Sequence, residues 1–199
     1  NPNWTGPEPA IDEIIYRSFR NDDALSQALL QGEVDFAYIT TPNIFDSLTD
    51  REDIGAVAGS IPSFQQIGVN TGSAYQEADG SFTPHGDGHP ALTDVTVRQA
   101  IRMAINSDEL VDKVLLGYGS AGDSIVPPVT VPGARWVPEG EERLAWDIPA
   151  ANQLLEDAGF VDSDGDGVRE MPPGSLEPGR PLEFRYHVRT NEQTSVDAA

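Results

Sequence analysis

Three carboxylates at alternate positions are the strongest candidate for chemistry in this sequence. Asp162, Asp164 and Asp166 are followed at once by Gly167, which has no side chain and so permits a sharp turn. The spacing is typical of the opening of a calcium-binding loop of the EF-hand type, in which alternate residues supply oxygen ligands. It therefore predicts a site for Ca²⁺ or another hard cation.

The second half of this loop departs from the EF-hand pattern. Its twelfth position is Pro173, where a bidentate glutamate would stand, and the ninth position, Glu170, is the remaining oxygen donor. The prolines and the glycine at 172–174 also exclude a second helix. Two interpretations stay open. The loop is either a solvated turn without an ion or a structural clip, in which a bound cation stabilises the surface loop and has no catalytic role. The predicted ligands of that clip are Asp162, Asp164, Asp166 and Glu170.

The histidines suggest a metal less strongly. His85 and His89 flank the sequence HGDGH in a stretch whose composition is that of a flexible loop. A flexible loop fixes no geometry that would select a transition metal, so we expect a mobile surface loop here. His187 falls on a predicted strand and is expected to be a packed or exposed side chain.

The sequence carries no recognisable catalytic motif. It lacks a Gly-x-Ser-x-Gly elbow, a Walker loop, a His-Glu-x-x-His pair and any cysteine. Pairs of carboxylates occur throughout so acidic a chain and therefore discriminate nothing. We expect no enzymatic activity, and the absence of cysteine also excludes disulfides and thiol chemistry.

The charge of the chain is strongly one-sided. Thirty-three acidic residues against twelve basic ones give a formal net charge of −21, and Lys113 is the only lysine. Nucleic acids and anionic membrane surfaces bind through cationic contacts, so neither is expected as a direct partner. The composition is typical of a halophilic proteome that accumulates salt, with an ordinary acidic exported protein as the alternative. Self-repulsion at low salt then predicts marginal folding without added salt.

The elements that position these residues alternate in type over the first seventy residues. Helices are predicted over 22–30 and 42–48, each ending near a turn residue. Strands are predicted over 11–16, 34–39, 54–58 and 64–69. Strands that alternate with helices at short connections favour an α/β lobe with helices against a sheet.

The middle of the chain changes character twice. Residues 72–90 are rich in Gly, Ser, Asp and Pro, which predicts a linker. From Asp94 an N-cap and apolar residues at three- and four-residue spacing predict a helix, and Asn106 begins a second helix that Gly117 stops. The chain then turns loop-rich and ends in a predicted strand over 182–188. We expect residues 1–70 in one lobe, 71–93 as the crossover and 94–199 in a second lobe.

Several stretches also resemble one family in that family's order. They are NPNW at 1–4 with PAIDEI at 9–14, LLQGEVD at 29–35, DVTVRQAI, NSDELV and LLGYG within 94–119, DIPAA and LLEDAGF within 147–160, and DSDGDGVRE with PLEF within 162–184. They resemble the signature regions of the family 5 extracellular solute-binding proteins, the peptide-, dipeptide- and nickel-binding receptors of ABC importers. The resemblance covers nearly the whole chain except residues 72–90.

The resemblance implies a fold and a role. The fold is a two-lobe, periplasmic-binding-protein-like α/β architecture (type II, cluster C-like), of which this chain is a central fragment containing pieces of both lobes. The role is solute capture for import, with a peptide as the expected solute and a permease and an ATPase as partners. The alternatives are a receptor for an oligosaccharide or a nickel chelate, and a calcium-stabilised surface module without a transport ligand. No cofactor is required, apart from the Ca²⁺ expected in the 162–170 loop.

The resemblance also implies a setting. The chain lacks an initiator Met, a signal sequence and an apolar run long enough to span a bilayer, so we expect it to be excised from a longer receptor. That receptor would be monomeric, lipid-anchored on the extracellular face of the membrane or periplasmic, and from a halophilic archaeon. The isolated fragment is expected to bind ligand weakly or not at all.

Ligand contact is expected at the carboxyl ends of strands and at the crossing between lobes. One candidate segment follows the second predicted strand, and another enters the strand that leads to the crossover. Aromatic side chains there offer apolar walls, and Thr and Gln offer hydrogen bonds. The alternative is that Phe64 is a core residue and that Thr41 only caps a helix. The candidates are Tyr38, Ile39, Thr40, Thr41, Ser63, Phe64, Gln65 and Gln66, with residues 117–128 as a further rim.

Overall fold

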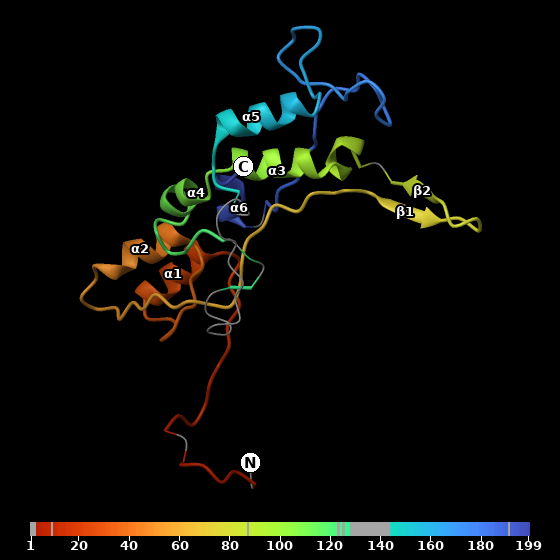
Figure 1. The fold of residues 1–199 in the computed structure, drawn as a ribbon. Coiled ribbons are helices and arrows are strands. Elements are labelled where there is room, and N and C mark those ends of the chain that lie inside the picture. The colour runs from red at the N-terminus through yellow and green to blue at the C-terminus, as the bar shows by residue number, and fades with distance from the viewer. Residues whose placement is uncertain are drawn as a thin grey trace. The chain divides into compact units, whose positions relative to one another are not determined.

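The computed structural model describes residues 3–8, 10–86, 88–122, 124, 126–127, 144–190 and 192–199, and they form two compact units (Figure 1). The first unit is Asn1–Val57 and the second is Ala58–Ala199. None of the helices in the described part of the chain is long and apolar enough to cross a membrane.

The first unit contains two helices, α1 (Asp22–Leu30) and α2 (Pro42–Thr49), both as predicted. The side chain of Asn21 caps α1 by accepting a hydrogen bond from the backbone of Ala24 at 3.0 Å. Helix α2 begins at Pro42, where the missing N–H of proline costs no hydrogen bond. The starting positions of these two helices therefore follow from residues close to them in the sequence.

The predicted strands over 11–16, 34–39, 54–58, 64–69 and 182–188 are not present as strands, although the structure describes all of these residues. Around the last of them, only an isolated antiparallel bridge joins Glu170 to Pro181. A strand exists only where a neighbouring strand accepts and donates its backbone hydrogen bonds. The strand prediction is therefore wrong for these five segments, because no two of them pair with each other in the described structure.

The predicted linker over 72–90 instead contains a hairpin. Strands β1 (Ser73–Gln76) and β2 (Phe82–His85) pair antiparallel, with Ser73 opposite His85 and Gln76 opposite Phe82. In the turn, the carboxylate of Asp79 accepts hydrogen bonds from the hydroxyl of Ser81 at 2.6 Å and from its N–H at 2.9 Å, which lower the pKa of Asp79. The composition suggested flexibility because turn residues dominate it.

Helices organise the second unit, beginning with the short 3₁₀ helix η1 (Pro90–Thr93) and α3 (Val95–Ala104). The Asp94 side chain caps α3 by accepting from the N–H of Thr96 at 2.8 Å. The other helices among its described residues are α4 (Ser107–Lys113), α5 (Ile148–Asp157) and α6 (Gln193–Asp197). Asn106 caps α4, and Gly117, with φ +81°, lies in the left-handed region just beyond it, as predicted.

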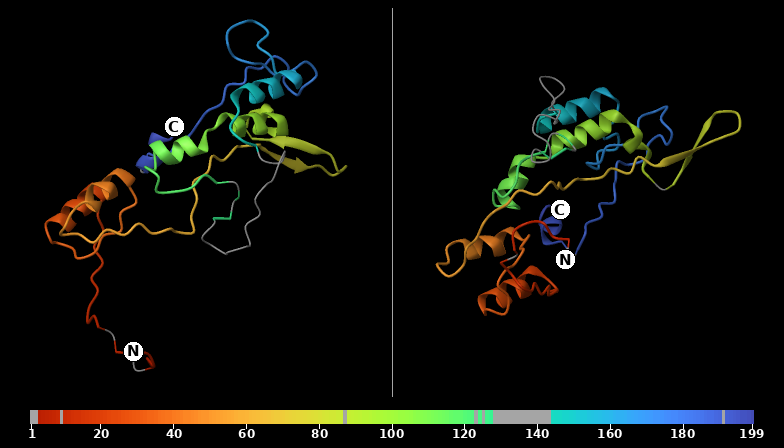
Figure 2. Two further views of the ribbon diagram at one scale, coloured as in Figure 1. Left: turned by 60° about the vertical axis from the view of Figure 1, so that its left-hand side comes forward. Right: turned by 90° about the horizontal axis from the view of Figure 1, so that it is seen from below.

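The core of the second unit lies where α3 and α5 run side by side (Figures 1 and 2). Val97 on α3 is almost completely buried and packs with η1 and with the segment that follows α5. Phe160 and Met171 come from that segment, so the Asp-rich loop between them is held at both ends by buried residues. The core cluster consists of Ala91, Val97, Phe160 and Met171, with Leu92, Ile101, Leu155 and Leu182 packed against it.

Candidate functional site

The end of the first predicted ligand segment is hydrogen-bonded to the carboxylate of Asp22, at the start of α1. Oδ2 of Asp22 accepts four hydrogen bonds, from the backbone N–H groups of Thr40 and Thr41, both at 2.8 Å, and from their hydroxyls at 3.1 and 2.7 Å. Burial alone would raise the pKa of Asp22, but these hydrogen bonds outweigh it and leave that pKa below its ordinary value. The carboxylate is therefore held in its charged form.

These hydrogen bonds determine whether the hydroxyls of Thr40 and Thr41 can act as donors or as acceptors toward a solute. Each hydroxyl has one O–H, which donates a hydrogen bond to the carboxylate of Asp22, so the oxygen lone pairs of Thr40 and Thr41 can act as acceptors. Tyr38, two residues earlier, is exposed, and Ile39 is half-buried. The first segment thus presents an exposed aromatic ring beside two acceptor hydroxyls.

The second predicted ligand segment lies in the other unit. Phe64 is half-exposed, so it is not the core residue that the alternative proposed. The amide nitrogen of Gln65 donates to the hydroxyl of Thr194 on α6 at 3.0 Å, which ties this segment to the end of the chain. Ser63 and Gln66 are exposed. The eight candidates therefore divide between the two units, four in each.

An open groove of about 410 Å³ begins next to the second segment, at Ile67. Its apolar lining includes Leu110 on α4, Val114 directly after α4 and the exposed side chain of Trp146. The ion pair of Glu109 and Lys113 also lines the groove, and the hydrogen bond from Lys113 lowers the pKa of Glu109. Apolar side chains with a few polar groups are the usual lining of a small-molecule site.

Within the further rim predicted over 117–128, Asp123, Ile125 and Pro128 lie outside the described residues. The start of the rim follows α4 through a tight turn, in which the N–H of Gly117 donates to the carbonyl of Val111 at 3.0 Å. Leu116 has a φ of +50°, so the chain is bent sharply here.

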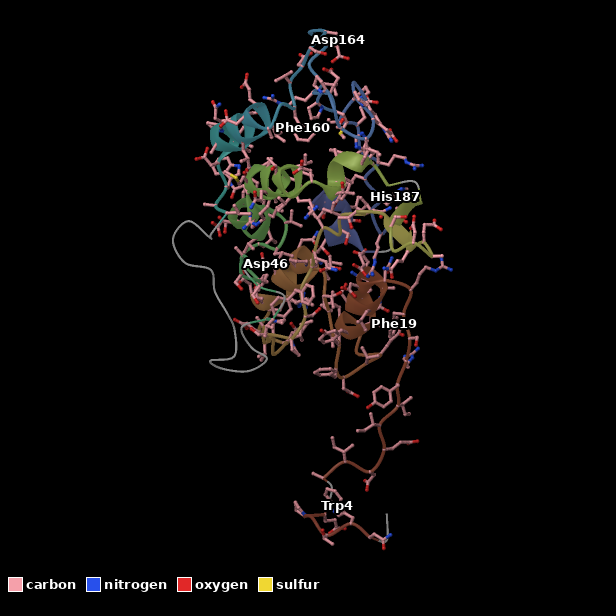
Figure 3. All side chains as sticks on the ribbon, turned by 45° about the vertical axis from the view of Figure 1, so that its right-hand side comes forward. Trp4, Phe19, Asp46, Phe160, Asp164 and His187 are labelled. Carbon is pink, nitrogen blue, oxygen red and sulfur yellow. The ribbon has the colours of Figure 1, made fainter. Side chains whose placement is uncertain are left out.

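The Asp-rich loop brings its four predicted ligands together. One oxygen from each of Asp162, Asp164, Asp166 and Glu170 lies within 4.8 Å of the others, so the group could hold a metal ion. The three aspartates are exposed and Glu170 is buried. Figure 3 shows Asp164 at the tip of the loop and Phe160 in the packed region below it.

Backbone hydrogen bonds shape this loop around its first aspartate. The carboxylate of Asp162 accepts from the N–H groups of Gly165 at 2.7 Å and Gly167 at 3.0 Å, and both glycines have positive φ. Oε2 of Glu170 accepts from the N–H and hydroxyl of Ser163, at 2.8 and 2.7 Å. The loop is thus folded by its own carboxylates, which explains how Glu170 can close it without a glutamate at the twelfth position.

Of the histidine pair, the structure describes the side chain of His89. His89 is buried, its Nδ1 accepts from the N–H of Ala91 at 3.1 Å, and its Nε2 lies 2.9 Å from the carbonyl oxygen of Pro181. With Nδ1 as acceptor, the proton resides on Nε2 and is donated to Pro181. The prediction of a mobile surface loop is therefore wrong for His89, while Asp87 and the side chain of His85 lie outside the described part. His187 is exposed (Figure 3).

Comparison with known proteins identifies the family. The middle-region model of the bacterial extracellular solute-binding proteins, family 5, matches residues 1–199, the whole chain. This chain belongs to that family.

Relatives of this family 5 chain show what kinds of protein it resembles. A putative ABC transporter peptide-binding protein of Brucella ovis is 30% identical over 160 residues, which cover 80% of this chain and 26% of the relative. The oligopeptide-binding protein AppA of Bacillus subtilis, solved with a nonapeptide, has a TM-score of 0.57 at 21% identity, covering 82% of this chain and 27% of AppA. NikA of Brucella suis, solved with Fe(III)-EDTA, has a TM-score of 0.58 at 21% identity, covering 89% of this chain and 31% of NikA. The family 5 chain thus spans about a quarter to a third of the length of these proteins.

Two features of this family 5 chain were missed by sequence reasoning. One is the role of Asp22 as the acceptor for Thr40 and Thr41, because a carboxylate at a helix start is usually explained by the helix dipole. Trp146 was not singled out, although a lone exposed tryptophan before the N-cap of α5 is an informative signal. The groove depends on α4 and α6 meeting near Ile67, which no local pattern predicts.

Proposed function

We propose that this chain is the middle part of a longer solute-binding receptor that captures peptides for an ABC importer. The match of the family model over residues 1–199 carries the proposal. A relative at 30% identity is named as a peptide-binding protein, and a protein of similar fold was solved with a nonapeptide. The chain acts as a receptor without catalysis and without a required cofactor.

In this proposal two α/β lobes of the periplasmic-binding-protein type (type II, cluster C-like) close on the solute by a hinge motion. Residues 1–70 belong to one lobe, 71–93 cross between lobes, and 94–199 belong to the other. The closed receptor is a monomer that docks on a membrane permease, whose ATPase subunits drive import. It works outside the cell membrane, lipid-anchored or periplasmic, in a halophilic archaeon, and contacts no nucleic acid.

We expect the peptide contacts at the eight candidate residues. Tyr38 and Phe64 provide exposed apolar surface for side chains of the solute, and Gln66 provides an exposed side-chain amide. The hydroxyl oxygens of Thr40 and Thr41 suit the N–H groups of a peptide backbone, because their own O–H groups already donate to Asp22. Ile39, Ser63 and Gln65 complete the set by shaping the two segments. A peptide offers both N–H donors and apolar side chains, and therefore fits this inventory.

The Asp-rich loop has a separate, structural role in the proposal. We expect Ca²⁺ to bind Asp162, Asp164, Asp166 and Glu170, because hard cations favour several carboxylate oxygens brought this close together. The ion would stabilise the conformation of a surface loop whose two ends are anchored in the core by Phe160 and Met171. It would take no part in capturing the solute.

Calorimetric titration of the longer receptor in molar salt tests the function. Peptides of two to nine residues, an oligosaccharide set and a nickel chelate are titrated separately, and heat from peptides alone supports the proposal. Phe64→Ala is expected to weaken peptide binding by about tenfold, since it removes one buried apolar contact. Leu176→Ala is the matched control, because Leu176 is exposed far along the chain from either segment. Heat from the oligosaccharides or the chelate alone replaces the solute class, and calcium heat without any solute heat supports a surface module instead.

A further inference from the structure

The described lining of the open groove next to the second candidate segment comes entirely from the second unit. Two hydrogen bonds between residues far apart in the sequence hold its walls. The side chain of Gln65 donates to the hydroxyl of Thr194 at 3.0 Å, which joins the candidate segment to α6. The N–H of Asp147 donates to the carbonyl of Met103 at 2.9 Å, which fixes the chain next to Trp146 against α3. The groove is therefore a feature that the fold maintains.

The apolar part of this lining is open to solvent. Trp146 is 54% exposed and Ile67 is 46% exposed, while Leu110 and Val114 in the same lining are half-buried. Apolar side chains that line a concave surface gain free energy when an apolar group displaces the water there. The indole N–H of Trp146 is a hydrogen-bond donor only, so it suits a carbonyl oxygen next to that apolar group. The groove thus fits an apolar side chain on a backbone that carries carbonyls.

The charged part of the lining favours a cation. Glu109 and Lys113 form an ion pair and balance each other. The remaining charged side chain of the described lining is Asp197, at the end of α6, whose carboxylate accepts a hydrogen bond from the neutral amide of Gln193 at 2.7 Å. Two carboxylates against one ammonium leave one negative charge, in a chain whose net charge is −21. An ammonium or guanidinium group is therefore attracted to the groove, and a carboxylate is repelled.

The size of the groove limits what can occupy it. Its volume of about 410 Å³ lies at the lower end of the range for small-molecule sites, so it holds roughly two adjacent residues of a peptide. An oligosaccharide offers hydroxyls but neither a positive charge nor an aliphatic side chain, and a second copy of this chain brings another net charge of −21. A peptide with an apolar residue next to a lysine or an arginine supplies both of the groups that the lining favours.

We propose that this groove binds an apolar residue and an adjacent lysine or arginine of the captured peptide, with the apolar side chain against Trp146 and the positive group at Asp197. The inference rests on the proposed function, because it names the class of peptide that the receptor selects. Ile67 in the groove lining directly follows Gln66, so a peptide at the second candidate segment reaches the groove without a break. The charges that attract a basic peptide also repel an acidic one.

Calorimetric titration of the longer receptor in molar salt tests this preference with the tetrapeptides Ala-Phe-Lys-Ala, Ala-Phe-Glu-Ala and Ala-Ser-Lys-Ala, all with free termini. We expect the first to bind about tenfold more tightly than either of the others, because it alone offers both the apolar and the positive group. Molar salt screens long-range attraction, so a preference that persists reports direct contact. Equal affinities for the three overturn the inference and leave peptide capture intact. Heat from no peptide, in this panel or in the wider set of two to nine residues, overturns both.

Two substitutions in the longer receptor test whether the groove makes this selection. Asp197→Asn should abolish the preference for lysine over glutamate and keep the preference for phenylalanine over serine, whereas Trp146→Ala should do the reverse. Asp112→Asn, on the exposed face of α4 and not in the described lining, is the matched control and should change neither ratio. Unchanged ratios in both groove variants overturn the inference, because the groove is then filled by the receptor's own polypeptide or left empty. If Trp146→Ala does not fold, Asp197→Asn and the wild-type panel decide.

Discussion

Oδ2 of Asp22 accepts hydrogen bonds from both the N–H of Thr41 at 2.8 Å and its hydroxyl at 2.7 Å. The start of α1 is thereby joined to the start of α2, eighteen to nineteen residues further along the chain. The hydroxyls of both threonines, which belong to the candidate ligand segment, also donate their O–H groups to this carboxylate. One carboxylate therefore both fixes the local fold and turns the candidate site into an acceptor surface.

The Asp22 contacts predict a pH dependence. Because the pKa of Asp22 is lower when folded than when unfolded, its contribution is fully present above about pH 4, the ordinary range of Asp, and is lost as pH falls through the lower folded value. We expect Asp22→Asn to lower the free energy of unfolding by about 1–3 kcal/mol at pH 7. The difference from wild type should shrink as pH is lowered from about 5 to about 3. Urea unfolding of the 199-residue chain in molar salt measures it.

A control separates this effect from general loss of charge. Asp112→Asn removes a carboxylate from the exposed face of α4, and its effect on stability should be small at every pH. If Asp22→Asn and Asp112→Asn follow the same pH profile, the hydrogen bonds of Asp22 contribute nothing specific.

Local signals carried much of the prediction from sequence. The caps at Asn106 and Asp94 and the glycine stop at Gly117 are short-range features, and the structure has the helices that they predict. The loop ligands from Asp162 to Glu170 also converge as their spacing suggested, because the loop folds on its own side chains.

Long-range features could not be predicted in the same way. Segment 34–39 has the composition of a strand, yet a strand needs partner backbone, and that partner is not determined by the segment itself. The burial of His89 depends on Pro181, ninety-two residues away, and the tie between Gln65 and Thr194 spans 129 residues. Composition alone predicted a mobile surface loop around the histidines, because this region holds many turn residues.

His89 predicts a stability effect in the second unit. Both ring nitrogens are hydrogen-bonded, and the ring packs edge-on against Phe184 with centroids 5.1 Å apart. We expect His89→Ala to cost about 2–4 kcal/mol, since it removes two buried hydrogen bonds and a ring contact. Denaturant unfolding in molar salt measures this.

A conservative replacement refines the His89 prediction. In His89→Asn the side-chain oxygen can still accept from Ala91, but the reach to Pro181 is lost, so the cost should be intermediate. A stability of His89→Ala within about 0.5 kcal/mol of wild type would contradict the assigned contacts.

Calcium is expected to stabilise the chain through the Asp-rich loop. Binding to the folded form alone adds about 2.7 kcal/mol at a calcium concentration 100 times the dissociation constant, so the melting temperature should rise with calcium. Asp164→Asn should reduce this rise strongly, because it removes one of four converging ligands. Asp112→Asn should leave it intact. An identical response of both variants, or no response of wild type, means that the loop is a solvated turn.

The net charge of −21 predicts a strong dependence on salt. Screening of self-repulsion should raise the melting temperature by about 10 °C or more between 0.1 M and 2 M KCl. An uncharged osmolyte at matched osmolality is the control, since it strengthens burial without screening charge. A melting temperature that is equal in dilute and molar salt contradicts the halophilic interpretation.

The measurement that tests peptide capture most directly is mass spectrometry of the small molecules that co-purify with the longer receptor in high salt. The account predicts a ladder of short peptides released on denaturation, with lengths that show the preference of the site. A single oligosaccharide or metal chelate in place of peptides would contradict the proposed solute class while keeping the family.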